Sequence, residues 1–463
     1  MGQSALKQRH ANSYGAVLVV IVGLLAIYVV GLPPSLTWVH HGADGGDLAT
    51  AVLRGSIPHP PGSPTYLLLS EFFIRLPWGD PAWRLNLMSA VLAAGAAGLT
   101  IAHRQYSTIV RISAGLLLGL APLWWSQALI TEVYAPAAFS TALTLYLLQH
   151  DAPGWVIGLV WGIGLGTHPT LIFLAPVVLI TNRERPHALQ TLVAAAGMTL
   201  LLYGPVLLIR GKIPFPWGDF QSWDGWWTFV TAKLYRHYLF ALPFAALPQR
   251  LIAWLSLLAQ QFTPIGALLA GGGWWVECHE RPFFAWTSLF AFLSWSGYAL
   301  WYNTADSLVY LVAALPLAAF WLIAGLDRAY QWLQQQKGDK FGAILLMLPL
   351  IQGWVWGPRM TLRRDQTAAS WAEATLTNAP SNAVLITMQD GHTFALWYAQ
   401  AAWNRRPDVM IIDSDLWVLP SYRRFLAESL GVESLTPGVT PEQVAREIQR
   451  PWQMIISEIP NER

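Results

Sequence analysis

Two acidic residues and a histidine lie close together near the start of the chain. Asp44 and Asp47 flank Gly45-Gly46, and His59 opens the sequence His59-Pro60-Pro61-Gly62. Carboxylates and imidazoles are the side chains that most often transfer protons in enzymes. The glycines permit a tight turn and the prolines a rigid one, so this segment could hold an acid–base group in a fixed position.

The composition indicates which kind of protein must position these groups. Of the 463 residues, 54% are hydrophobic and 12% are charged, whereas soluble domains carry about 25% charged residues. The net charge of +2 shows no bias toward nucleic acid, and a single cysteine excludes an internal disulfide framework. The sequence therefore predicts an α-helical, multi-spanning membrane protein that is embedded in a lipid bilayer.

The apolar segments predict about eleven transmembrane helices, each near the length that a bilayer requires. They cover residues 15–32, 85–103, 108–124, 129–149, 153–167, 169–182, 189–209, 250–272, 284–301, 306–327 and 341–357. The two segments on either side of His168-Pro169 are short, as in a broken helix.

Charge density predicts two domains. Residues 1–358 hold 32 of the 54 charged residues, and the much shorter 359–463 holds 22. We therefore expect a transmembrane domain over 1–358, with long loops at 33–84 and 211–248, and a soluble domain over 359–463.

The predicted soluble domain has an α/β pattern. Its apolar strands at 383–388, 409–412 and 452–456 alternate with helical segments, which is typical of a small α/β unit with parallel pairing. Acidic residues and a histidine follow these strands, either as ligands or as turn formers: Asp390, His392, Asp413 and Asp415.

The distribution of lysine and arginine predicts the orientation in a cell (plasma or inner) membrane. A cytoplasmic N-terminus leaves the short loops near 125, 168 and 303, which lack lysine and arginine, on the outside. An odd number of spans then places the C-terminal domain outside the cytoplasm. The same topology gathers ionisable residues at the outer face, namely Asp44, Asp47, His59, Glu132, His168, Asp219 and Asp306.

The ionisable residues at the predicted outer face have two interpretations. Ionisable groups at membrane depth are costly unless they face a cavity and find partners, which favours a polar chamber. Alternatively, Asp44, Asp47, Glu132 and Asp306 cap helix N-termini, and His168 makes a hydrogen bond at a helix break. Sequence alone leaves both open.

Several sequence blocks resemble the transmembrane protein 260-type O-mannosyltransferases and their prokaryotic relatives. The blocks are Gly42-Ala43-Asp44-Gly45-Gly46-Asp47-Leu48, His59-Pro60-Pro61-Gly62-Ser63-Pro64, Trp125-Ser126-Gln127, Glu132-Val133-Tyr134, Gly164-Leu165-Gly166-Thr167-His168, Trp217-Gly218-Asp219, Asp390-Gly391-His392-Thr393-Phe394 and Arg406-Pro407-Asp408-Val409. The chain departs from the family pattern at Ser63, Pro216 and Phe220, where tyrosine, asparagine and proline are usual.

The resemblance implies a GT-C-like fold and an activity. GT-C enzymes are integral-membrane glycosyltransferases that use polyprenyl- or dolichyl-phosphate sugars, and an acidic residue of the first outer loop acts in catalysis. That role falls on Asp44, with Asp47 at a position usually held by glutamate. The expected reaction is an inverting transfer of a hexose such as mannose from a polyprenyl phosphate to a protein or glycan hydroxyl. A carboxylate takes the hydroxyl proton, and neither a metal nor a cofactor is obligatory.

The implied leaving group is a phosphate, which basic side chains could stabilise. The candidates for donor or phosphate binding are His59, His168, Lys233, Arg236 and His237. The substrate chamber is predicted to include Glu132, Tyr134, Trp217, Asp219 and Asp306. Trp217 belongs to a tryptophan-rich loop, in which the rings either stack on a sugar or form an aromatic belt at the membrane interface.

A second function class fits the same composition. A transporter or flippase for a lipid-linked saccharide would also enclose a polar chamber. Such proteins usually show inverted repeats and ionisable groups near mid-membrane. No convincing internal repeat is present, and the polar residues gather at one face, which favours the transferase.

Overall fold

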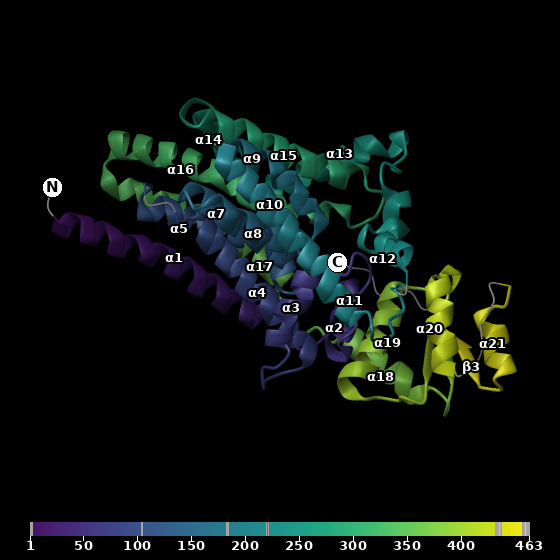
Figure 1. Ribbon diagram of the computed structural model, residues 1–463. Helices are drawn as coiled ribbons and strands as arrows, with labels where there is room; N and C mark the ends of the chain where they lie inside the picture. Colours follow the sequence, from purple (N-terminus) through teal and green to yellow (C-terminus); the bar gives the residue numbers. More distant parts are fainter. Residues whose placement is uncertain are drawn as a thin grey trace.

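A helical bundle with a small domain at one end makes up the molecule (Figure 1). This computed structural model describes residues 3–102, 105–181, 185–218, 220, 222–430, 435, 438–455 and 459. The α-helices of the bundle are α1 (Gln3–Gly31), α4 (Pro81–Thr100), α5 (Thr108–Gly119), α6 (Pro122–Ala128), α7 (Tyr134–Gln149), α8 (Gly154–Leu165), α9 (Ala175–Thr181), α10 (Arg185–Leu201), α11 (Leu207–Arg210), α13 (Leu247–Gln261), α14 (Thr263–Glu280), α15 (Pro282–Trp301), α16 (Leu315–Lys337) and α17 (Met347–Met360).

Shorter helices occupy the connections. They are η1 (Val39–Asp44), α2 (Gly45–Arg54), α3 (Pro64–Phe73), η2 (Pro169–Leu174), the π-helical η3 (Leu202–Val206), α12 (Trp223–Val230), η4 (Lys233–Tyr238), η5 (Phe244–Ala246), η6 (Ser307–Ala314) and η7 (Asp339–Leu346). The segment 33–84, predicted as a long loop, therefore carries η1, α2 and α3 in full.

The bundle has the apolar helices of a membrane protein. In the part of the chain that the structure describes, four helices are long and apolar enough to cross a membrane, or six if each of two bent pairs is one span. The number of spans and the orientation of the termini remain predictions.

The segment predicted as a span over 250–272 is not one continuous helix. The structure has two helices there, α13 and α14, which meet at an angle of 92°. Pro264 has no N–H to donate and disfavours the helical conformation for the residue before it. Thr263 has a φ of 62°, outside the right-handed helical region, and the chain turns at this point. A similar bend of 68° separates α5 from α6, which begins at Pro122.

Small residues let α8 and α10 pack closely. A methyl group at Gly158 would lie 2.2 Å from the carbonyl oxygen of Thr191, and one at Gly162 would lie 2.7 Å from that of Ala195. Glycines at this spacing allow two helix backbones to approach within van der Waals contact.

Gly158→Ala is therefore expected to destabilise the protein by about 1–3 kcal/mol, because the added methyl must push α10 away. Thermal unfolding in detergent measures the effect. Gly197→Ala on α10 is the matched control, since a methyl there meets no atom within 4 Å. Equal unfolding temperatures for the two variants would contradict the close packing.

The C-terminal domain, hereafter the tail, is a three-stranded parallel sheet with helices around it. Its elements are α18 (Thr367–Asn378), β1 (Val384–Thr387), α19 (Asp390–Trp403), β2 (Met410–Asp413), η8 (Leu416–Val418), α20 (Pro420–Leu430), α21 (Pro441–Glu447) and β3 (Trp452–Met454). The strand order is β2-β1-β3, and both pairs are parallel. The predicted α/β unit is confirmed, although the last strand is shorter than 452–456.

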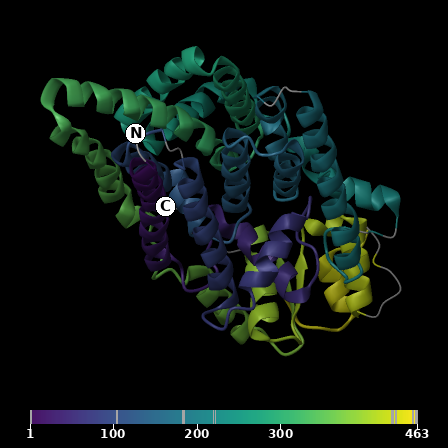
Figure 2. The same cartoon turned by 60° about the vertical axis from the view of Figure 1, so that its left-hand side comes forward.

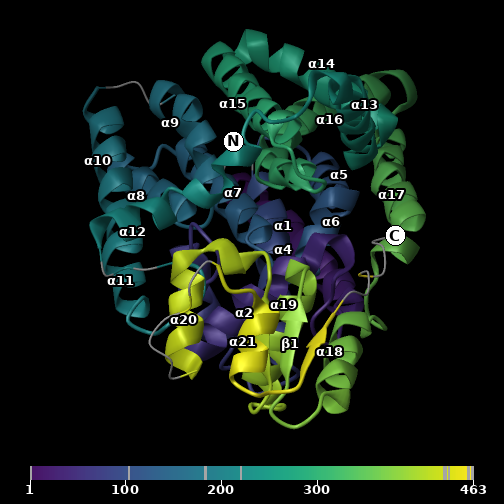
Figure 3. The ribbon, with the colours of Figure 1, turned by 90° about the vertical axis from the view of Figure 1, so that its right-hand side faces the viewer.

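The tail packs directly on the first loop of the bundle. Figures 2 and 3 show the tail beside α2, with α19 against it. A methyl group at Gly46 of α2 would lie 2.6 Å from the carbonyl oxygen of Phe394 in α19, so the two helices touch through this glycine. Buried residues of the loop and of the tail form one hydrophobic cluster.

Candidate functional site

A cavity of about 560 Å³ lies where the helical bundle meets the tail. Its volume falls within the range of small-molecule sites. Seven of the residues predicted from the sequence line it, although they come from widely separated parts of the chain: Asp44, His59, Glu132, Tyr134, His168, Arg236 and Asp306.

Asp44 presents its carboxylate to this cavity. It is the last residue of η1 and precedes α2, yet its side chain makes no capping hydrogen bond. The side chain is 46% exposed, and its Oδ2 lies 3.8 Å from Nε2 of His59. Burial raises the pKa of the Asp44 carboxyl, and the nearby His59 opposes that rise. The Asp44 side chain therefore lines the cavity and makes no capping hydrogen bond to the helix that follows it.

Asp47 lies behind His59 and does not line the cavity. It is 3% exposed, and its carboxylate has three protein donors. Oδ2 accepts from the backbone N–H of His59 at 2.7 Å and lies 2.9 Å from Nδ1 of the same residue. Oδ1 accepts from Nε1 of Trp217 at 3.0 Å. Asp47, which the sequence analysis paired with Asp44 as a catalytic candidate, thus contacts His59 and Trp217 and is not among the residues that line this cavity.

The two neighbouring carboxylates favour the protonated form of the His59 imidazole. Burial lowers the pKa of His59, but Asp44 and Asp47 outweigh burial and raise that pKa to about 10. His59 is therefore a cation at neutral pH, held in place from behind by Asp47 and facing the cavity beside Asp44.

Asp47→Asn is expected to lower the free energy of unfolding by about 1–3 kcal/mol, since the amide group cannot accept from all three donors. Chemical or thermal unfolding measures the loss. Asp224→Asn, at an exposed position on α12, is the control and should change stability little. An Asp47→Asn variant as stable as this control would show that the three contacts contribute nothing.

The bundle supplies the opposite wall of the cavity. Glu132 is 4% exposed and accepts from the backbone N–H of Val133. Nδ1 of His168 lies 2.8 Å from Oγ1 of Thr170, so the hydrogen bond expected at this helix break is present in a residue that also lines the cavity. The rings of Tyr134 and His168 lie 5.9 Å apart.

Several lining residues were missed by sequence reasoning. Tyr298 and Tyr310 pack with their ring centroids 5.0 Å apart and line the cavity, and Asp390 reaches it from the tail. The four-residue spacing of Tyr298, near the end of α15, and Tyr302, just after that end, was an available signal, since residues four apart in a helix share one face. The sequence analysis named Asp390 as a ligand or a turn former but did not connect it with this cavity.

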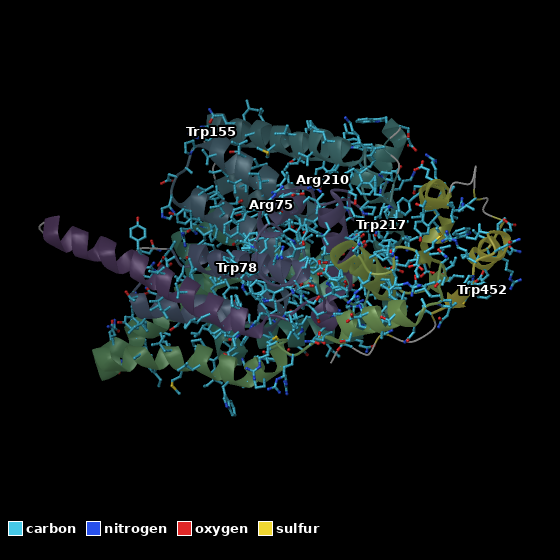
Figure 4. The ribbon with its side chains drawn as sticks, turned by 90° about the horizontal axis from the view of Figure 1, so that it is seen from below. Arg75, Trp78, Trp155, Arg210, Trp217 and Trp452 are labelled. Carbon is cyan, nitrogen blue, oxygen red and sulfur yellow. The ribbon has the colours of Figure 1, made fainter. Side chains whose placement is uncertain are left out.

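The remaining predicted residues lie elsewhere. Trp217 is buried behind the site, and Figure 4 shows it between the bundle and the part of the tail that carries Trp452. Lys233 and His237 are exposed on η4 and are not among the lining residues, and Nδ1 of His237 contacts the carbonyl oxygen of Leu234. Asp219 lies outside the described residues.

No group of three or more His, Cys, Asp or Glu side chains suited to hold a metal ion occurs in the described part of the chain. The prediction that no metal is obligatory remains a prediction.

The fold is that of the GT-C class of membrane proteins. It is similar to the crystal structure of ArnT from Cupriavidus metallidurans bound to undecaprenyl phosphate, with a TM-score of 0.55 and 13% sequence identity over 87% of this chain and 91% of that one. The apo structure of the same protein matches with a TM-score of 0.52 and 12% identity, over 88% of this chain and 91% of that one. The predicted fold class is confirmed.

Sequence comparison confirms the family resemblance. Residues 44–186 match the model of the Protein O-mannosyl-transferase TMEM260 N-terminal domain, and residues 368–433 match TMEM260-associated domain 2. The Protein O-mannosyl-transferase TMEM260 of Mus musculus is 25% identical over 233 residues, which are 45% of this chain. The match covers 33% of that relative, so the chain spans about a third of its length. Two segments of the chain thus match models of TMEM260 domains, and one includes Asp44 while the other includes Asp390.

Proposed function

We propose that this protein is an integral-membrane glycosyltransferase that moves a hexose such as mannose from a polyprenyl phosphate to a hydroxyl of a protein or glycan. The observation that carries the proposal is the cavity that Asp44 lines together with two basic residues, His59 and Arg236, with the Asp44 carboxylate 3.8 Å from His59. The O-mannosyltransferase relative supports the sugar and acceptor class.

Asp44 is the general base. The acceptor oxygen attacks the anomeric carbon while Asp44 takes the hydroxyl proton, and the bond from that carbon to the phosphate oxygen breaks. A single displacement inverts the anomeric configuration. A raised pKa suits this role, because a base works best when its pKa lies near the working pH.

The cations stabilise the leaving phosphate. When the sugar departs, the polyprenyl phosphate gains negative charge and needs fixed positive charge nearby. His59 lies on the Asp44 side of the cavity, and Arg236 reaches it from η4. Asp47 acts through His59 by orienting its ring and keeping it protonated.

Apolar residues at the cavity suit a lipid-linked donor. Ile172, Phe173, Val230 and Leu239 line the same cavity as the charged groups, and Ile172 is 51% exposed. A polyprenyl chain can lie along such a surface while its phosphate reaches Arg236. The structural similarity to ArnT bound to undecaprenyl phosphate supports a donor of this kind. The proposed orientation has the N-terminus in the cytoplasm and the tail outside.

The experiment combines transfer with product analysis. Purified protein receives polyprenyl-phosphate mannose, tritiated in the sugar and of known anomeric configuration, with a synthetic peptide rich in serine and threonine. We expect labelled peptide, with the anomeric configuration opposite to that of the donor by NMR. Retained configuration would contradict the single displacement, and release of free mannose alone would contradict transfer to a hydroxyl.

A further inference from the structure

The tail contributes a residue to the reaction cavity. Asp390, the first residue of α19, lines the cavity together with Asp44 and His59. It is the one tail residue among the described residues that line it. The sequence alone had offered ligand binding or a turn as its role.

Direct contacts fix the start of α19 against the loop that carries Asp44. Nε1 of Trp38 donates to the carbonyl oxygen of Gly391 at 3.0 Å. The ring of Trp38 also lies 5.7 Å from that of His392, which stacks on Trp371 at 4.2 Å. Trp38 immediately precedes η1, so these contacts hold Asp390 and Asp44 in a fixed relation.

The far end of α19 is tied to the bundle as well. Nε1 of Trp403 donates to Oδ2 of Asp80 at 2.8 Å, and the hydroxyl of Tyr398 donates to Oδ1 of the same carboxylate. Asp80 also caps α4 by accepting from Ala82. Because both ends of α19 are held, Asp390 is a fixed part of the cavity wall.

This placement gives the cavity two sides. Glu132, His168 and Tyr310 come from the bundle, Asp390 comes from the tail, and Asp44 lies on the loop between them. The polyprenyl donor approaches from the bilayer, and its phosphate pairs with the cations His59 and Arg236 rather than with a carboxylate. A water-borne acceptor approaches from the tail, and its hydroxyl and N–H groups are donors that a carboxylate accepts.

We propose that Asp390 is a residue of the acceptor-binding subsite and positions the attacking hydroxyl next to Asp44 by accepting a hydrogen bond from the acceptor. The reaction site is thereby formed by residues of the bundle together with Asp390 of the tail. This inference rests on the glycosyltransferase function proposed above.

The test is a separation of acceptor and donor kinetics in the full-length protein. Initial rates are measured with tritiated polyprenyl-phosphate mannose and the serine- and threonine-rich peptide, each varied in turn. Asp390→Asn is expected to raise the KM for the peptide about 10–100-fold, the loss for a hydrogen bond to a charged group. The KM for the donor and the affinity for undecaprenyl phosphate should stay within about twofold of wild type by the same reasoning.

Asp415→Asn is the matched control. Asp415 is also an acid that follows a strand of the tail, but it is not among the residues that line the cavity. Both kinetic constants of this variant should match those of the wild type. Thermal unfolding of the two variants separates a kinetic effect from a loss of folding.

The pH dependence gives a second readout. Burial and Asp44 raise the pKa of the Asp390 carboxyl to about 7, Asp413 and Asp415 add to the rise, and His59 opposes it. The ionised form that binds the acceptor is therefore present above pH 7 and is lost as the pH falls through 7. The KM of the wild type for the peptide should rise below pH 7, and Asp390→Asn should remove that dependence.

Three results would overturn the inference. If the wild type transfers mannose and Asp390→Asn keeps the wild-type KM for the peptide, the subsite assignment fails while the proposed function stands. If Asp390→Asn raises the KM for the donor instead, Asp390 belongs to the donor side. If the wild type transfers no label, the proposed function fails and the acceptor subsite fails with it.

Discussion

Asp44→Asn is expected to lower the rate of sugar transfer by about 10²–10⁴-fold, which is the usual contribution of a general base. The amide has nearly the same shape as the carboxylate but cannot take a proton from the acceptor. The measurement is the turnover number with tritiated polyprenyl-phosphate mannose at saturating peptide.

Folding should survive this change, because the Asp44 side chain caps no helix. Its unfolding temperature should therefore match that of the wild type. Asp224→Asn, an exposed acid on α12 outside the cavity, should retain full activity. A fully active Asp44→Asn variant would remove Asp44 from the mechanism.

Arg236→Gln should lower the turnover number by about 10²–10³-fold, because it removes a cation from the developing phosphate charge. The loss should appear in the turnover number more than in the KM for the donor, since the charge grows as the bond breaks.

Lys233→Gln is the matched control for this variant. Lys233 and Arg236 lie on the same short helix, η4, and both are exposed, but only Arg236 is among the lining residues. Lys233→Gln should therefore keep nearly the wild-type rate. Equal losses in the two variants would indicate a general effect of charge on membrane or lipid binding.

The segment that carries Asp44 was largely predictable from sequence. Glycines beside Asp44 and prolines after His59 restrict the backbone, so local spacing brings the carboxylate and the imidazole to one place. The direction in which Asp47 points was not predictable. Its partner Trp217 is 170 positions away in the sequence, and such a contact depends on how distant segments pack.

Hydropathy located most helices but not the break at Thr263. Apolar residues continue through Phe262 into α14, so the average over 250–272 resembles one span. The local signal was Pro264, whose effect on the preceding residue outweighs the hydropathy pattern.

The contribution of Asp390 was the least accessible to sequence reasoning. Its position after a buried strand fits a turn as well as a ligand site. What decides between them is the docking of α19 on α2, through Gly46 and Phe394, which are separated by most of the chain. Long-range packing of this kind leaves no periodic pattern in a single sequence.

The most direct test of the central claim is to follow the fate of the sugar in proteoliposomes. Protein is reconstituted with tritiated polyprenyl-phosphate mannose, and the peptide is supplied in the buffer. The proposed function predicts label on the peptide, lost in Asp44→Asn, with no movement of the donor between leaflets. Donor that moves between leaflets while the peptide stays unlabelled would contradict it and favour a flippase.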